Sequence, residues 1–383
     1  SNWAVNAATL TGALNISSGF TSGGPLNLNA TGNSTIAGNL ALASSSTNTW
    51  SVNPNLTMTV SGNISGTSAA ITKNGTGLLV LSGSNSYTGA TTINAGTLQI
   101  GAGGTTGSLS ASSAITNNAT LLIDRSDSLT LGNTISGTGV LTKNGTGTLT
   151  LSAVNSYTGG TTVNAGTLSL ATAAANGTIR GNLTINQGAR VDANATNWSL
   201  GYGGTQNYIG NSVSAITING GTLNFTDTTS DGGIVAATTV LTGGTISSAG
   251  NFAFLSTLTY NQTVQSLASA NRSTIASGIG LRMNFSPSIG NLIFDVASGT
   301  TSDGIDLQVN GGIINASSQG GGNIVKSGSG TLTLAGNNTY TGATTISAGT
   351  LTVSGTGQLG GGSYAGAIAN SGNFIYASTA NQT

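Results

Sequence analysis

Residues 143–168 read KNGTGTLTLSAVNSYTGGTTVNAGTL, and this stretch decides the fold. Threonine and leucine alternate at 148–151, which is the pattern of a strand with one buried face. A similar alternation returns at 161–163 and 167–170, after turns that contain Gly and Asn. The stretch therefore predicts three short strands, each of about five residues, separated by tight turns.

The same stretch occurs three times in the chain. The other copies read KNGTGLLVLSGSNSYTGATTINAGTL at 73–98 and KSGSGTLTLAGNNTYTGATTISAGTL at 326–351, and all three align without a gap. Every lysine of the chain lies in a copy, and a tyrosine follows each lysine after fourteen positions. The residues that define the repeat are Lys73, Tyr87, Gly96, Leu98, Lys143, Tyr157, Gly166, Leu168, Lys326, Tyr340, Gly349 and Leu351.

The repeat residues have simple structural interpretations. We interpret each lysine as the mark of a turn before the first strand of its copy. Each tyrosine is interpreted as a corner packing residue whose hydroxyl reaches water or backbone. The lysines are too far apart along the chain to form a contiguous ladder of charge.

Two arrangements of the short strands are open. Hairpins could join them into an antiparallel sandwich, or the chain could coil so that equivalent strands stack in parallel about 4.8 Å apart. Charged residues make up 4% of the chain. Stacked coils place like on like, so neutral Thr, Ser and Asn are favoured over charges. The composition thus favours an all-β, right-handed parallel β-helix, or β-solenoid, of roughly 17 coils at roughly 22 residues per coil.

Composition also excludes several functional classes. Eight cationic side chains are balanced by eight acidic ones, which cannot supply the basic surface of a nucleic-acid binder. The chain has no Cys and no His, which removes thiol chemistry, His-assisted nucleophiles and the usual zinc sites. No apolar run is long enough for a transmembrane helix. We expect no catalytic residue, no cofactor and no enzyme activity.

Repeat copies suggest the organisation of the chain. We expect one continuous solenoid over 1–383, with degenerate coils at 1–72, two clear repeats at 73–170 and further degenerate coils at 171–325. A loop insertion is expected near 199–214, and 326–383 holds the third repeat and the start of a further unit. Because the chain begins without Met and ends inside a repeated pattern, we expect both ends to be cut from something longer.

A few residues could form sites. Asp303 and Asp306 are weak candidates for a calcium site, but two aspartates that cap backbone amides in a turn are the favoured interpretation. The run 124–127 (DRSD) could bind carbohydrate or catalyse, yet a solvated ion pair is simpler. Trp3, Trp50 and Trp198 could stack on sugars, yet isolated tryptophans in β proteins are usually core or wedge residues. A carbohydrate-binding role would rest on the groove of the fold and on the loop near Tyr202 and Tyr208.

The three copies resemble the passenger-associated transport repeat, also called the autotransporter-associated β-strand repeat. The matching parts are the K-N/S-G-T/S-G opening, the T-L-T-L-type strand, the N-S/T-Y-T-G turn and the T-T-I/V-x-A-G-T-L close. The resemblance implies a secreted or surface-exposed bacterial β-helix, a passenger of the type V secretion route with little or no catalytic machinery.

These observations lead to three functional hypotheses. The favoured one is a structural, non-catalytic extracellular segment that acts as a stiff rod or fibre-forming unit, located outside the cell or on the bacterial outer surface. The second is an adhesin that binds carbohydrate or a host surface, and the least favoured is a polysaccharide-degrading enzyme. The expected partners are further copies of the chain, associating end to end or laterally, and cell-surface glycans.

Overall fold

The structure is a computed structural model that describes residues 3–5, 8–172, 177–194, 200, 213–226, 233–234, 238–250, 252–255, 261–282, 290–315 and 322–383. The chain divides into two compact units, Ser1–Ser169 (unit 1) and Leu170–Thr383 (unit 2). Both are built of short strands, and the one helical element of the described residues is a 3-10 turn, η1 (Gly360–Gly362).

Unit 1 consists of strands that stack in chain order into parallel sheets. The first sheet contains β1 (Trp3–Val5), β4 (Phe20–Ser22), β7 (Leu40–Ala41) and β10 (Ile64–Ser65). The second contains β2 (Ala8–Gly12), β5 (Leu26–Ala30), β8 (Thr47–Val52), β11 (Ala70–Asn74), β13 (Thr91–Ile93), β15 (Ile115–Asn117) and β18 (Ile135–Ser136). The third contains β3 (Asn15–Ile16), β6 (Ser34–Ile36), β9 (Thr57–Val60), β12 (Leu78–Leu81), β14 (Thr97–Ile100), β16 (Thr120–Ile123), β19 (Val140–Lys143) and β21 (Thr161–Val163). The remaining strands are β17 (Leu129–Leu131), β20 (Thr148–Leu151) and β22 (Thr167–Leu170), which reaches the boundary between the units.

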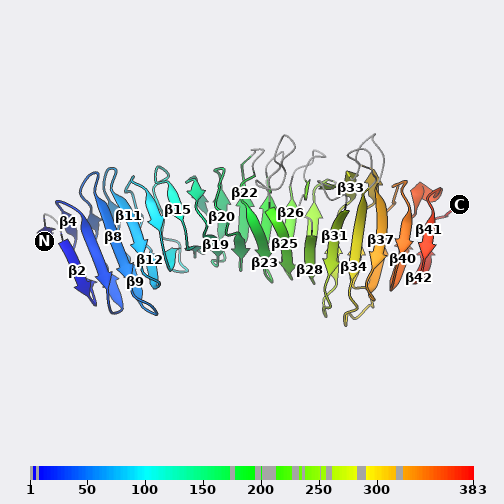
Figure 1. Ribbon diagram of the computed structural model, residues 1–383, viewed down its shortest axis with the longest axis horizontal. Helices are drawn as coiled ribbons and strands as arrows, with labels where there is room; N and C mark the ends of the chain where they lie inside the picture. Colours follow the sequence, from blue (N-terminus) through cyan, green and yellow to red (C-terminus); the bar gives the residue numbers. More distant parts are fainter. Residues whose placement is uncertain are drawn as a thin grey trace. The chain divides into compact units, whose positions relative to one another are not determined.

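Unit 2 has the same construction, and its strands follow one another in chain order in Figure 1. One sheet contains β23 (Gly181–Ile185), β25 (Val213–Asn219), β28 (Thr238–Thr242), β31 (Asn261–Ser266), β34 (Asn291–Val296), β37 (Asn323–Ser327), β39 (Thr344–Ile346) and β41 (Ile368–Asn370). A second contains β24 (Arg190–Ala193), β26 (Thr222–Phe225), β29 (Thr245–Ser248), β32 (Ser273–Ile275), β35 (Leu307–Val309), β38 (Thr331–Leu334), β40 (Thr350–Gly355) and β42 (Asn373–Ser378). A third contains β27 (Gly233–Ile234), β30 (Phe252–Leu255), β33 (Ile279–Arg282) and β36 (Ile313–Asn315).

Each coil contributes one strand to each of its sheets, and equivalent strands pair in parallel. Leu98, for example, pairs with Leu79 of the coil before it and Leu121 of the coil after it. Inward positions form continuous apolar ladders, such as the buried series Ile246, Ile275, Val309, Leu334 and Val353 of unit 2. The all-β parallel solenoid is thus confirmed, and the antiparallel sandwich is excluded.

The predicted number of coils is slightly too high because many coils are longer than assumed. In unit 1 the coil length is close to the assumed one: the hydrogen-bonded partners Asn85 and Ile64, in neighbouring coils, are 21 residues apart. In unit 2 the separation reaches 33 residues between Asn219 and Asn186. The expected loop near 199–214 lies almost entirely outside the described residues, and β25 begins at Val213.

Candidate functional site

The repeat lysines lie inside the solenoid. Lys73, Lys143 and Lys326 stand in strands β11, β19 and β37, and their side chains are 0%, 2% and 0% exposed. Lys73 is paired in register with Trp50 in one neighbouring coil and Ile93 in the other. Each lysine does precede the turn before the first strand of its copy, as expected, but its burial in the solenoid was not foreseen.

Backbone carbonyl groups surround each buried ammonium group. Lys73 Nζ donates to the carbonyl oxygens of Asn74 (2.8 Å), Gly75 (2.7 Å) and Ala95 (3.1 Å). Ala95 belongs to the following coil, so the lysine joins two coils at one corner. An ammonium group carries three N–H donors and can be buried here because all three find an acceptor.

The other two copies repeat this arrangement. Lys326 Nζ donates to the carbonyls of Ser327 (2.7 Å), Gly328 (2.8 Å) and Ala348 (3.2 Å). Lys143 Nζ donates to those of Gly145 (2.5 Å) and Ala165 (2.8 Å). We call each group of carbonyl oxygens a carbonyl cage.

Burial lowers the pKa of each lysine from 10.5 to about 8. Nearby carboxylates oppose this effect at two of the three cages. Asp124 acts on Lys143, and Asp295 and Asp306 act on Lys326. At neutral pH the ammonium form still predominates in all three.

The glycine that closes each repeat is required by the cage. Gly96, Gly166 and Gly349 have φ values of +69°, +64° and +68°. A Cβ atom at Gly349 would lie 2.4 Å from the carbonyl oxygen of Gly328 and 2.8 Å from Lys326 Nζ. Both the backbone conformation and the close approach of the coils thus demand glycine. Leu98, Leu168 and Leu351, two positions further on, are fully buried core residues.

Each repeat tyrosine is buried, and its hydroxyl is hydrogen-bonded to a threonine four positions later. The Oη–Oγ1 distances are 2.7 Å for Tyr87 and Thr91, and 2.6 Å for both Tyr157–Thr161 and Tyr340–Thr344. Burial raises the pKa of each of these phenols. The expectation that the hydroxyl meets water or backbone is wrong, because the solenoid interior supplies a threonine partner.

A buried asparagine in each repeat was missed by the sequence analysis. The side chain of Asn85 accepts from the amide of Ile64 (3.0 Å) and donates to the carbonyls of Gly83 (3.1 Å) and Ser108 (2.9 Å). It therefore replaces ladder hydrogen bonds at a corner and joins three coils. Asn155 and Asn338 stand at the same position of their copies. The signal was this Asn before S/T-Y, which occurs in all three repeats.

The aspartates considered for calcium have separate hydrogen-bonding partners. Asp306 is 8% exposed, and its carboxylate accepts from the amides of Gly299 (2.6 Å) and Thr331 (2.8 Å). Asp303 accepts from the amide of Ile305 (3.1 Å) and pairs with Arg272. Among the described residues, no three His, Cys, Asp or Glu side chains gather closely enough to hold a metal ion.

Arg125 holds a corner and is not the solvated surface group that was expected. Its guanidinium is 11% exposed and donates to the carbonyls of Gly107 (2.6 Å) and Thr105 (2.7 Å). It also forms a two-point ion pair with Asp127 at 2.7 and 2.8 Å, and this pair lowers the pKa of the carboxyl. The Arg125 guanidinium can be buried because loop carbonyl groups accept the hydrogen bonds that water would otherwise accept.

The aromatic residues considered for sugar stacking offer no described binding surface. Trp50 is a core residue whose Nε1 donates to the carbonyl of Leu26 at 3.0 Å. Trp198, Tyr202 and Tyr208 lie outside the described residues, as does the side chain of Trp3.

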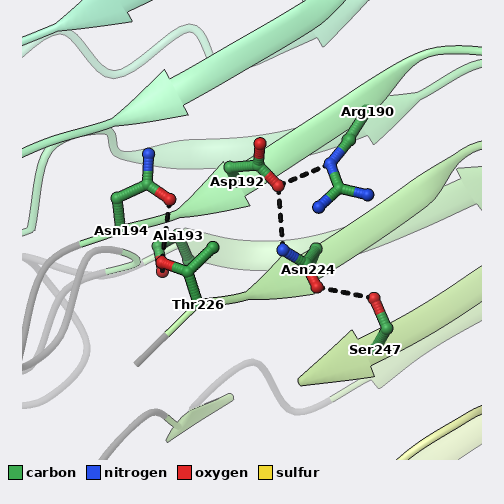
Figure 2. A network of polar contacts seen from close by, with 7 residues as sticks. All are labelled: Arg190, Asp192, Ala193, Asn194, Asn224, Thr226 and Ser247. Atoms are coloured by element: carbon green, nitrogen blue, oxygen red, sulfur yellow. Dashed lines mark hydrogen bonds and ion pairs between the residues drawn. The ribbon is translucent and has the colours of Figure 1, made fainter. Parts of the chain in front are cut away.

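Figure 2 shows a polar network that crosses three coils on the outer face of β24, β26 and β29. Asp192 accepts from Arg190 Nε (2.6 Å) and from Asn224 Nδ2 (2.9 Å). Asn224 in turn accepts from the hydroxyl of Ser247 at 2.8 Å. We call Arg190, Asp192, Asn224 and Ser247 the polar strip. Its Asp192, Asn224 and Ser247 side chains lie in register in three successive coils, and Asp192 is its single carboxylate.

The three copies match one protein family. The passenger-associated-transport-repeat model matches residues 71–100, 141–170 and 324–353. The chain carries three passenger-associated transport repeats. The carbonyl cages, the buried asparagines and the buried tyrosines all lie within the three matched segments.

A curated protein is also similar to part of the chain. The adhesin BmaC autotransporter of Brucella suis biovar 1 (strain 1330) is 47% identical over 107 residues, or 27% of this chain. The match covers only 3% of that relative's length. Passenger repeats and an autotransporter relative place the chain outside the cell or on the bacterial surface.

Two further observations concern the chain. No solved structure gives a significant match to it. Within the part of the chain that the structure describes, no helix has the length and apolar character needed to cross a membrane.

Proposed function

We propose that this chain is a structural, non-catalytic segment of a long bacterial surface or secreted protein, and that it serves as a stiff β-solenoid spacer. The observation that carries the proposal is the use of the repeat's buried polar groups. The buried lysine, asparagine and tyrosine side chains of the repeat are each occupied by a partner within the solenoid.

These contacts link coils in both directions along the chain. The Lys326 ammonium reaches forward to the corner at Ala348. Asn338 reaches back to the amide of Ile313 and forward to the carbonyl of Gln358. One repeat thus fastens three successive coils. Such contacts resist sliding and peeling of coils, which is what a spacer under tension requires.

Single-molecule pulling on the full chain tests this function. We expect Lys326→Met and Asn338→Ala to lower the force at which unit 2 unravels and to leave the unravelling of unit 1 unchanged. Asn94→Ala is the matched control, because Asn94 is exposed and makes one side-chain hydrogen bond, to Asn74. If the two buried variants unravelled at the wild-type force, the repeat contacts would not bear load and the proposal would fail.

A second candidate is a carbohydrate-binding adhesin. It is supported by the relative from Brucella, which is an adhesin by name, and by the polar strip, whose in-register donors and acceptors suit sugar hydroxyl groups. A glycan array with the purified chain tests it. Saturable binding that Asp192→Ala abolishes and Asp303→Ala preserves would favour the adhesin over the spacer, and absence of binding to any glycan would remove it.

A further inference from the structure

Backbone carbonyl oxygens converge on the ammonium group of each repeat lysine. The cage at Lys326 consists of the carbonyl oxygens of Ser327 and Gly328 from one coil and Ala348 from the next, at 2.7 to 3.2 Å from Nζ. The cage at Lys73 consists of the carbonyl oxygens at the equivalent positions, Asn74, Gly75 and Ala95, at distances of 2.7 to 3.1 Å.

Glycines set the shape of the cage independently of the lysine. Gly328 and Gly75, which supply one oxygen each, have φ values of +74° and +71°. Gly349 and Gly96 close the following coil with φ near +68°. Because these conformations belong to the corners, the carbonyl oxygens converge on one point whichever group occupies it.

Three convergent carbonyl oxygens match the three N–H donors of a primary ammonium group. The ladder positions on either side of Lys326 hold Phe294 and Ile346, whose side chains carry no hydrogen-bond donor. At the cage of Lys326 the carboxylates of Asp295 and Asp306 add negative potential. For Lys73, burial is the cause of the lowered pKa, with no carboxylate among the contributing groups.

We propose that each cage is a primary-ammonium site which the lysine fills from within, and that the N–H donors of the occupying group, rather than the aliphatic stem, lock the corner of the next coil. When the side chain is truncated, the cage takes a free alkylammonium ion instead. The cage of Lys326 binds such an ion more tightly than the cage of Lys73, because only the former has carboxylates nearby.

Hydrogen exchange on the full chain carrying Lys326→Ala tests this proposal, with n-butylammonium chloride as the probe. The reporters are the backbone amides of Ser347 and Thr350. They donate to the backbone carbonyl oxygens of Lys326 and Gly330, respectively, in the preceding coil. We expect exchange at these amides to become about tenfold faster or more in the variant, as expected when buried acceptors lose their donors. Millimolar n-butylammonium restores protection.

Controls separate recognition of the ammonium donors from cavity filling. Tetramethylammonium has the charge but no N–H donor, and 1-butanol has the same chain shape but no charge and a single O–H donor; neither restores protection. Leu351→Ala opens a cavity in the same repeat, and n-butylammonium does not rescue it. Equal rescue by 1-butanol or tetramethylammonium, or no rescue by n-butylammonium, overturns the proposal.

Two further variants keep the test decisive if Lys326→Ala does not fold. Lys326→Met retains the stem and removes the ammonium, so it exchanges faster at the same amides; wild-type protection in this variant overturns the proposal. Lys73→Ala requires a higher n-butylammonium concentration for half-rescue than Lys326→Ala. The reverse order contradicts the role assigned to Asp295 and Asp306.

Discussion

Replacing Asn338 by alanine removes a side chain that forms hydrogen bonds with backbone groups of three successive coils. Asn338 is fully buried; its Oδ1 accepts from the amide of Ile313 at 3.0 Å, and its Nδ2 donates to the carbonyls of Gly336 (2.7 Å) and Gln358 (2.9 Å). A buried hydrogen bond contributes about 1 kcal/mol, and an unsatisfied buried partner costs about 1–3 kcal/mol. We therefore expect Asn338→Ala to reduce the local stability of unit 2 by about 3–5 kcal/mol.

Native-state hydrogen exchange measures this loss at the amide of Ile313, which has the side chain of Asn338 as its acceptor. Asn94→Ala is the matched control: its Nδ2 donates to Asn74 Oδ1 at 3.0 Å on an exposed surface. This control should cost less than about 0.5 kcal/mol. If Asn338→Ala cost no more than Asn94→Ala, the claim that buried asparagines replace ladder hydrogen bonds would be refuted.

Three other perturbations have defined outcomes. Gly349→Ala should cost at least about 2 kcal/mol in chemical denaturation, from its left-handed backbone and the 2.4 Å approach to the carbonyl of Gly328, whereas an unchanged midpoint would contradict this geometry. Burial lowers the pKa of Lys326 from 10.5 to about 8. Between these two pH values the unfolded chain keeps the proton and the folded chain has lost it, so the free energy of unfolding rises with pH. The rise from neutral pH to pH 9.5 is about 2 kcal/mol. Lys326→Met should abolish that part of the rise, and equal pH profiles would show that the lysine is not the cause. Arg125→Ala frees the carbonyls of Thr105 and Gly107, so limited proteolysis should cut between 101 and 107 in the variant and spare the wild type.

Alternation of apolar and polar residues was enough to predict the strands and the core. Leu149 and Leu151 point inward, as the period of two requires, and the same holds for Leu98. Low charge and repetition together selected the parallel coil over the hairpin, because both follow from stacking like on like.

The inward direction of the lysines was present in the sequence but hidden by their charge. In 70–74 (AITKN) the buried residues are Ile71 and Lys73, which share one face of the strand. Period two therefore places the lysine inside. A charged side chain is ordinarily excluded from that position, and only the stacked coils reveal the carbonyl oxygens that compensate it.

Contacts between coils explain what sequence reasoning could not supply. Asn85 and Ile64 are 21 residues apart, and Asn338 and Ile313 are 25 apart. Since coil length varies along the chain, no fixed spacing identifies the partner of a buried polar group. Arg125 was misjudged for the same reason, because its acceptors Thr105 and Gly107 lie one coil away.

Distances between spin labels in unit 1 test the stacked-coil account most directly. The outward positions Thr35, Gln99, Thr142 and Thr162 lie on one sheet, and successive register pairs place Thr142 five coils and Thr162 six coils from Thr35. The chain has no cysteine, so introduced cysteines can be labelled without background. At about 4.8 Å per coil, the account predicts backbone separations of about 24 Å for 35–142 and about 29 Å for 35–162. Distances that did not grow by this step from coil to coil would contradict it.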